Sequence, residues 1–181
     1  VNWCFGASGC GVTTLLRLLA RDIQPTYGKI EVDPITLDLS DDNSLCEYQS
    51  CFGILKRCNM QKNLTLRENI ALPLVVANTK ASQINERVDG LLNLFALSSF
   101  SDDLPSRCSE GVLLQAALAR LLVVQPKVLL LDRVFSRLDL TCQNKVFTIL
   151  NELASYGLTV VAGEDKPPVY SASNVHLVTL S

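Results

Sequence analysis

The most constraining feature of the chain is a glycine-rich segment, GASGCGVTT, at residues 6–14. A short apolar run precedes it at residues 1–5, and residues 12–20 are rich in leucine with helical spacing. Three glycines within nine residues predict a tight turn in which successive backbone N–H groups point inward. Because the following helix adds the positive end of its dipole, the order strand, glycine-rich turn and helix predicts a phosphate-binding loop.

The segment fits the phosphate-loop template G-x-x-x-x-G-K-[ST] at every fixed position except the lysine. Val12 stands at that position and has neither a charge nor a hydrogen-bond donor, while Thr13 stands where a hydroxyl would reach Mg²⁺. The glycines alone would also fit a plain strand-to-helix turn, so the interpretation depends on motifs further along the chain. The residues expected to bind nucleotide are Gly6, Ser8, Gly9, Gly11, Thr13 and Thr14.

Composition excludes several classes of protein. The chain has 181 residues, of which 48% are hydrophobic and 19% charged, so it can bury a real core and its length favours one domain. Its 16 Lys and Arg against 18 Asp and Glu leave no basic surplus, so we expect no nucleic-acid partner. No apolar stretch approaches the roughly 18 residues of a membrane span. The seven cysteines form no CxxC pair, which indicates reduced thiols and a reducing compartment.

Apolar periodicity predicts strands that alternate with helices. We expect strands at residues 1–5, 29–32, 35–39, 51–55, 128–131 and 159–162, and helices at 12–20, 82–96, 112–124 and 141–155. Thr65 and Glu68 form a capping-box pattern at the start of segment 66–76, which Pro73 is expected to break. The alternation predicts an α/β fold with a mostly parallel sheet flanked by helices. We expect a single domain over residues 1–181, with a helical lobe at about 64–122 inserted in the α/β core.

Three further segments occur in a recognisable order: GKI at 28–30, LTLRENIALPLV at 64–75 and ALARLLVVQPKVLLLD at 117–132. They resemble the ATP-binding subunits of ABC transporters, and ENIALPL most resembles the branch that powers lipoprotein release, macrolide-type export and the cell-division transporter-like complex. The resemblance covers almost the whole chain and implies a P-loop NTPase-like fold. Only residues 1–5 precede the loop, so the family's N-terminal antiparallel strand region is expected to be largely missing, either absent or outside this chain.

The resemblance also implies which residues stand at the family's catalytic positions. Val12 stands at the position of the family's phosphate-loop lysine, and Arg57 at that of the glutamine that senses Mg²⁺ and the attacking water. Arg133 stands at the position of the catalytic glutamate, and Glu164 at that of the switch histidine. The magnesium aspartate is kept as Asp132, so Thr13 and Asp132 are the implied ligands of Mg²⁺ if nucleotide binds.

Two further family motifs survive in part. The signature LSGGQ falls on CSEGV at residues 108–112, which keeps Ser109 and Gly111 but places Glu110 at a glycine position. The loop after the catalytic position is SRLD at residues 136–139, which ends on Asp139.

These departures weaken the chemistry of ATP hydrolysis, which depends on positioning and on charge neutralisation at the γ-phosphate. Val12 in place of lysine removes a charge-assisted hydrogen bond of roughly 1.5–3 kcal/mol. Arg133 cannot accept a proton, because guanidinium stays protonated. In a contrary interpretation, Arg57 and Arg133 lie near the phosphates and partly replace the lysine, whereas arginines on surfaces are more often solvated.

We therefore expect no catalytic residues and no enzymatic activity, so the chain would be a pseudo-ATPase. We expect no cofactor, and the alternative is ATP or ADP with Mg²⁺. The leading hypothesis is a degenerate ABC-type domain that serves as a structural or regulatory subunit of a membrane-associated complex. One alternative is an ATP-binding transporter subunit that works with a competent partner; another is a scaffold subunit of a large organelle or envelope assembly. Implied partners are a permease-like membrane subunit, other subunits of the complex, and a second ABC-type domain in a homo- or heterodimer. The expected location is peripheral, on the cytoplasmic or organelle-matrix face of a membrane.

Overall fold

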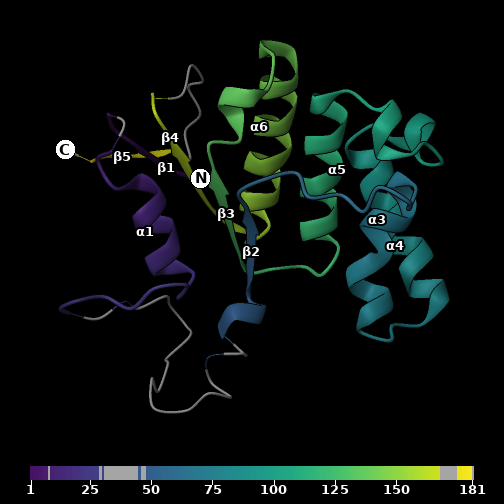
Figure 1. The fold of residues 1–181 in the computed structure, drawn as a ribbon, viewed down its shortest axis with the longest axis horizontal. Helices are drawn as coiled ribbons and strands as arrows, with labels where there is room; N and C mark the ends of the chain where they lie inside the picture. Colours follow the sequence, from purple (N-terminus) through teal and green to yellow (C-terminus); the bar gives the residue numbers. More distant parts are fainter. Residues whose placement is uncertain (8, 29, 31–44, 46–47, 168–174, 181) are drawn as a thin grey trace.

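The core of the protein is a five-stranded sheet, seen in a computed structural model that describes residues 1–7, 9–28, 30, 45, 48–167 and 175–180 (Figure 1). The strands lie in the order β2-β3-β4-β1-β5, and every neighbouring pair is parallel. The strand bounds are β1 Asn2–Phe5, β2 Phe52–Leu55, β3 Val128–Asp132, β4 Thr159–Glu164 and β5 His176–Thr179. The predicted α/β fold with a parallel sheet is therefore confirmed.

Helices cover both faces of the sheet, and alternate residues of β3 meet different helices. Leu130 packs with Leu16 of α1 on one face, whereas Leu131 belongs to the larger core that includes α5 and α6. Both leucines are completely buried, as expected for an interior parallel strand. The helices are α1 Val12–Leu19, α3 Leu66–Val76, α4 Ala81–Leu94, α5 Glu110–Leu122 and α6 Leu140–Ser155.

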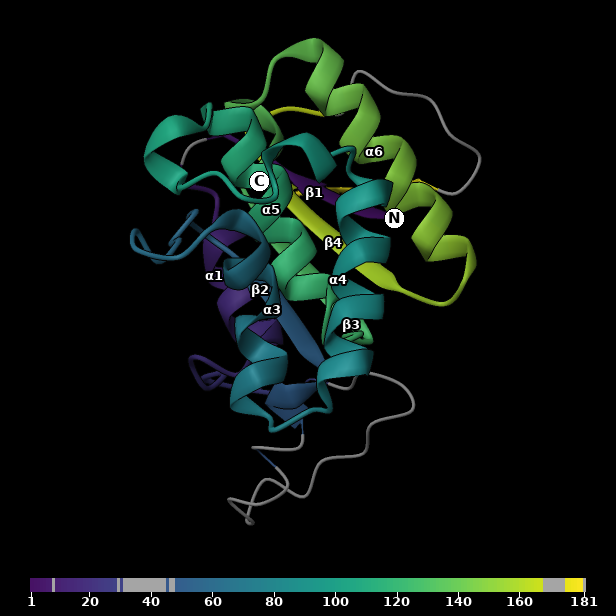
Figure 2. The same ribbon diagram turned by 90° about the vertical axis from the view of Figure 1, so that its right-hand side faces the viewer.

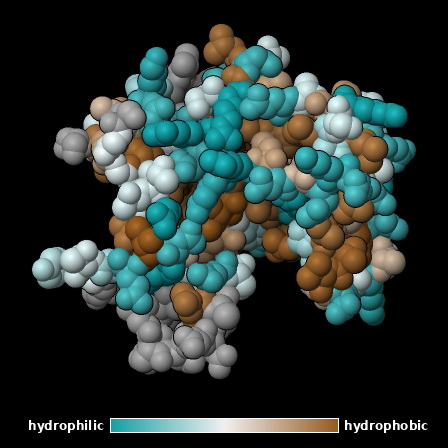
Figure 3. Space-filling model, in the orientation of Figure 1, coloured by the Kyte–Doolittle hydropathy of each residue, from teal (hydrophilic) through white to brown (hydrophobic). Residues whose placement is uncertain are grey.

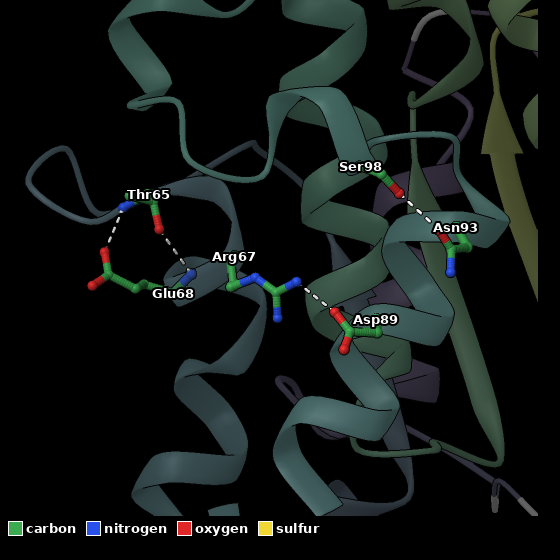
Figure 4. Close-up of polar contacts among 6 residues, drawn as sticks. All are labelled: Thr65, Arg67, Glu68, Asp89, Asn93 and Ser98. Atoms are coloured by element: carbon green, nitrogen blue, oxygen red, sulfur yellow. Dashed lines mark hydrogen bonds and ion pairs between the residues drawn. The ribbon is translucent and has the colours of Figure 1, made fainter. Parts of the chain in front are cut away.

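Helices α3, α4 and α5 pack against one another beside the sheet, in the region predicted to be a helical lobe (Figures 1 and 2). The capping box at the start of α3 is present: the Thr65 hydroxyl accepts from the Glu68 N–H, and the Glu68 carboxylate accepts from the Thr65 N–H at 2.7 Å (Figure 4). An Arg67–Asp89 ion pair joins α3 to α4 in the same view.

Pro73 does not break α3, so that expectation is wrong. The helix continues to Val76, with Pro73 inside it. Leu66 and Ile70 before the proline and Leu74 after it are all buried. Packing of this face against α4 and α5 outweighs the local preference of proline, which is a typical tertiary override of intrinsic propensity.

Other segments differ from expectation mainly at their ends. Helix α5 begins at Glu110, two residues earlier than expected, because the Ser109 hydroxyl caps it by accepting from Val112 N–H at 3.4 Å. Strand β4 extends to Glu164, and β5 follows it at the sheet edge. The strands expected at 29–32 and 35–39 lie outside the described residues apart from residue 30, for which no strand is assigned.

Apolar surface gathers over the part of the molecule where α3 and α4 lie, at the lower right of Figure 3. The exposed apolar residues at the end of α3 are Val75 and Val76. Within the described residues, no helix is both long enough and apolar enough to cross a membrane.

Candidate functional site

The glycine-rich loop joins the carboxyl end of β1 to α1, as the sequence predicts. Gly9 and Gly11 have φ angles of 92° and 98°, a conformation that residues with a Cβ rarely adopt. Gly11 is the N-cap of α1 and has no side chain to satisfy the first N–H groups of the helix. Those donors are available to an anion, as in a phosphate-binding loop.

The hydroxyl of Thr13 donates to Asp132 Oδ1 at 3.0 Å. Thr13 comes from the first turn of α1, and Asp132 is the last residue of β3. The carboxyl ends of parallel strands meet at one edge of the sheet, which brings together two residues separated by 119 positions in sequence. Hydroxyl and carboxylate oxygens are ligands that Mg²⁺ prefers, so the pair implied by the resemblance lies together and fits that ion chemically.

Val12 is a core residue in this structure, with 5% of its surface exposed. Its Cγ1 lies over the backbone of Gly163 in β4, where an added Cβ would come within 2.5 Å. Leu16 Cδ1 would lie 2.9 Å from the same added atom. The side chain at the lysine position of the template therefore packs on the sheet and provides no charge to the loop.

A cavity of about 140 Å³ lies against the loop. Residues 6, 7 and 9–14 form one side, and Arg133 and Asp165 complete it. Arg133 Nη2 lies 3.2 Å from Asp165 Oδ1, and both side chains are about half exposed. The structure therefore places Arg133 beside the predicted loop, whereas its replacement of the lysine stays a prediction.

Two of the predicted site residues, Arg57 and Ser8, are not among the described residues that line the loop cavity. Arg57 is exposed and lines a different cavity, of about 440 Å³, with Lys56, Asn59 and Arg120. Arg57 is not among the described residues that line the loop cavity, so its interpretation as a cation near the phosphates stays a prediction. Ser8 lies outside the described residues.

Glu164, at the switch position, is buried with 4% of its surface exposed. Its carboxylate accepts from Phe135 N–H at 2.7 Å and from Ser136 N–H at 3.3 Å. Burial raises the pKa of this carboxyl, and the N–H donors of Phe135 and Ser136 partly oppose the shift. Glu164 thus joins the end of β4 to the loop that follows β3.

Asp139 closes that same loop as the N-cap of α6, where it accepts from Cys142 N–H at 2.9 Å. The hydrogen bonds from Cys142 lower the pKa of the Asp139 carboxyl. On the neighbouring helix α5, Gly111 lies close to α6: an added Cβ would be 3.5 Å from the Cys142 sulfur. The signature remnant Ser109–Gly111 therefore lies at the start of α5, next to the start of α6.

Comparison with known proteins gives the family of the chain. The sequence pattern of the ABC transporter family matches residues 3–136, from β1 through the loop that contains Arg133. The chain belongs to the ABC transporter family. This match includes both the glycine-rich loop and the Asp132 strand.

Two relatives show how this family member compares with curated proteins. The methionine import ATP-binding protein MetN of Histophilus somni is 36% identical over 158 residues, which are 86% of this chain and 46% of the relative. MetN of Photobacterium profundum is 37% identical over 149 residues, 82% of this chain and 43% of the relative. The chain therefore spans less than half the length of these relatives.

Solved structures support the fold. One similar structure is the dimeric post-hydrolysis state of the ATP-binding cassette MJ0796, bound to ADP and Pi. Its TM-score is 0.78 at 27% identity, and the match covers 91% of this chain and 74% of the MJ0796 chain. The protein cbiO1 of Clostridium perfringens, part of the transporter complex cbiONQ, has a TM-score of 0.82 at 22% identity, with 91% and 66% coverage. At that identity the second likeness shows the fold alone.

These comparisons contradict the prediction that the chain is a pseudo-ATPase and no enzyme. Its relatives are named as ATP-binding proteins, and nothing in the matches indicates a pseudoenzyme. They also support the alternative of an ATP-binding transporter subunit better than a structural or regulatory role. The relatives are named for methionine import, so membership of the lipoprotein-release, macrolide-export or cell-division branch stays a prediction.

One residue of the loop cavity was missed by the sequence analysis, namely Asp165. Asp165 directly follows Glu164 in the AGED segment, and only Glu164 of this segment matches a family position in the sequence analysis. The missing information was the register of β4 beside β3, which pairs Asp132 with Gly163 and so places Asp165 near Arg133.

Proposed function

We propose that the chain is the ATP-binding domain of an ABC transporter, binding Mg-ATP at the glycine-rich loop and working with a catalytically competent partner domain. The observation that carries the proposal is the hydrogen bond between Thr13 and Asp132. It lies beside the first N–H groups of α1, which no described side chain caps. We propose a single domain over residues 1–181 with the helical lobe at 64–122.

In this proposal the chain's own residues bind and orient the nucleotide. The N–H groups that follow Gly11 donate to phosphate oxygens, and the helix dipole of α1 favours their negative charge. Thr13 and Asp132 would hold Mg²⁺, which neutralises phosphate charge when it is bound. Gly6, Ser8 and Thr14 complete the proposed nucleotide-binding set.

The remaining proposed sites lie away from the loop. Ser109 and Gly111, at the N-terminus of α5, would face the nucleotide of a paired domain, and Asp139 would lie at the same contact. Pairing of this kind fits the dimeric form of the similar cassette MJ0796. We also propose a membrane permease-like subunit as partner and a peripheral location at a membrane.

Titration calorimetry with Mg-ATP tests the proposal directly. We expect saturable binding by the wild-type chain that weakens at least tenfold in Thr13→Val, because one polar ligand is lost from the phosphate and metal site. Ser155→Val, an exposed hydroxyl at the far end of α6, is the matched control and should bind as the wild type does. Absence of any binding by the wild type would overturn the proposal.

A further inference from the structure

The loop cavity lacks the cation that the phosphate-loop template places at residue 12. Val12 is buried over Gly163, so it faces β4 and provides no charge. Two or three phosphates concentrate negative charge in a small volume, and helix N–H groups carry only partial charges. Any side-chain cation for a nucleotide in this cavity therefore comes from a position other than residue 12.

Arg133 is the only cation among the described residues that line the cavity. It directly follows Asp132, whose carboxylate accepts from the Thr13 hydroxyl. Arg133 therefore lines the same cavity as the loop. It does so from the end of β3, which β4 separates from β1 in the sheet.

The backbone holds Arg133 in an unusual conformation. Its φ of 52° lies in the left-handed region, which is uncommon for arginine. The Arg133 N–H donates to the carbonyl of Gly163 at 2.8 Å, which fixes this turn to β4. Strained residues that are held by their surroundings occur at binding and active sites more often than elsewhere.

The Arg133 guanidinium has hydrogen-bond donors that can bind a further acceptor. Its Nη2 lies 3.2 Å from Asp165 Oδ1, but its Nε is buried and has no hydrogen-bond partner within the described part of the chain. Because both side chains of the pair are about half exposed, their ion pair is weak and easily exchanged for another anion. The planar fork of arginine suits phosphate, to which it can donate two parallel hydrogen bonds.

We infer that Arg133 binds the terminal phosphates of the nucleotide and replaces the missing lysine of the loop. Asp165 is its counterion when no nucleotide is bound, and the guanidinium exchanges this carboxylate for phosphate oxygens on binding. The inference rests on the proposed function, since it names the residue that provides the positive charge at the same site.

Calorimetry with Mg-ATP, Mg-ADP and AMP tests the inference on the full chain. Arg133→Gln should weaken binding of Mg-ATP by about 10- to 100-fold, because a charge-assisted contact to phosphate is lost. Binding of AMP should change less than about threefold, since it has no terminal phosphates. Arg133→Lys keeps the charge and should recover a large part of the affinity for Mg-ATP.

Lys127→Gln is the matched control, because it also removes one positive charge. Lys127 is exposed and precedes the first residue of β3, about 20 Å along the strand from Arg133 at 3.3 Å per residue. That separation exceeds the screening length of physiological salt. Asp165→Asn should act in the opposite direction and tighten binding of Mg-ATP, because it removes a negative charge and frees the guanidinium.

The outcomes separate the two claims. If the wild type binds Mg-ATP and Arg133→Gln binds equally well, the inference is wrong and the proposed function stands. If Arg133→Gln and Lys127→Gln weaken binding by the same factor, only overall charge matters and the inference is again wrong. If the wild type binds neither Mg-ATP nor Mg-ADP, both claims are overturned. Thermal melts of every variant show whether it is folded, and Asp165→Asn tests the inference with Arg133 intact.

Discussion

The position of Val12 gives a sharp test of the site, through substitution of the glycine beneath it. In Gly163→Ala the new methyl would lie 2.5 Å from Val12 Cγ1 and 2.9 Å from Leu16 Cδ1. Carbon atoms in contact are normally 3.5–4.0 Å apart, so these side chains must shift by about 1 Å. Overpacking of this kind costs about 1–3 kcal/mol, and the gain from replacing glycine in a strand offsets about 0.5–1 kcal/mol.

The free energy of unfolding should therefore fall by about 0.5–2 kcal/mol, which lowers the melting temperature by about 1–8 °C in a domain of this size. Urea unfolding followed by circular dichroism measures this change. Gly90→Ala is the control. Apart from the neighbouring backbone of α4 itself, no atom of the described residues lies within 4 Å of the added Cβ, and alanine should stabilise α4 by about 0.5–1 kcal/mol.

The double variant Val12→Ala/Gly163→Ala identifies the cause. Removing two methyl groups from Val12 makes space for the new one, so the two substitutions should be coupled by at least about 1 kcal/mol. Strictly additive effects, or a Gly163→Ala variant as stable as the wild type, would refute the conclusion that Val12 packs on β4.

Three further predictions concern stability. Burial raises the pKa of Glu164, so the folded state loses stability as pH rises from the ordinary pKa of a glutamate through the raised pKa. Glu164→Gln should therefore show a smaller decline in stability with rising pH than the wild type in urea unfolding; parallel profiles would contradict the shift. Thr65→Ala should destabilise the protein by about 1 kcal/mol through loss of the α3 cap, and no loss in urea unfolding would argue against the capping box. Leu130→Ala should cost about 2–5 kcal/mol by the same assay, because Leu130 is completely buried on the face of the sheet that α1 covers. A cost below 1 kcal/mol would mean that β3 is not interior.

Local signals in the sequence were sufficient to predict most elements of the fold. The continuous apolar run of β3 indicates a strand buried on both faces, and the Thr65–Glu68 pair predicts the start of α3. Pro73 was misjudged because its neighbours Ile70 and Leu74 are held by packing that local propensity does not include.

Only the part of the site that lies within one continuous segment of the chain was predictable from the sequence. The glycine loop is contiguous, so its turn and its link to α1 follow from sequence. The pairing of Arg133 with Asp165 depends on the register of β3 against β4, which no short pattern specifies. That Arg57 lines a different cavity depends on strand order, which places β2 at the edge of the sheet.

The central claim is that the loop holds a nucleotide by its phosphates, and a crystal structure with Mg²⁺ and a non-hydrolysable ATP analogue tests it most directly. We expect the β-phosphate within hydrogen-bond distance of the N–H groups that follow Gly11, and the guanidinium of Arg133 on the terminal phosphates in place of Asp165. An analogue bound elsewhere, with the cavity beside Thr13 holding only water, would contradict the account.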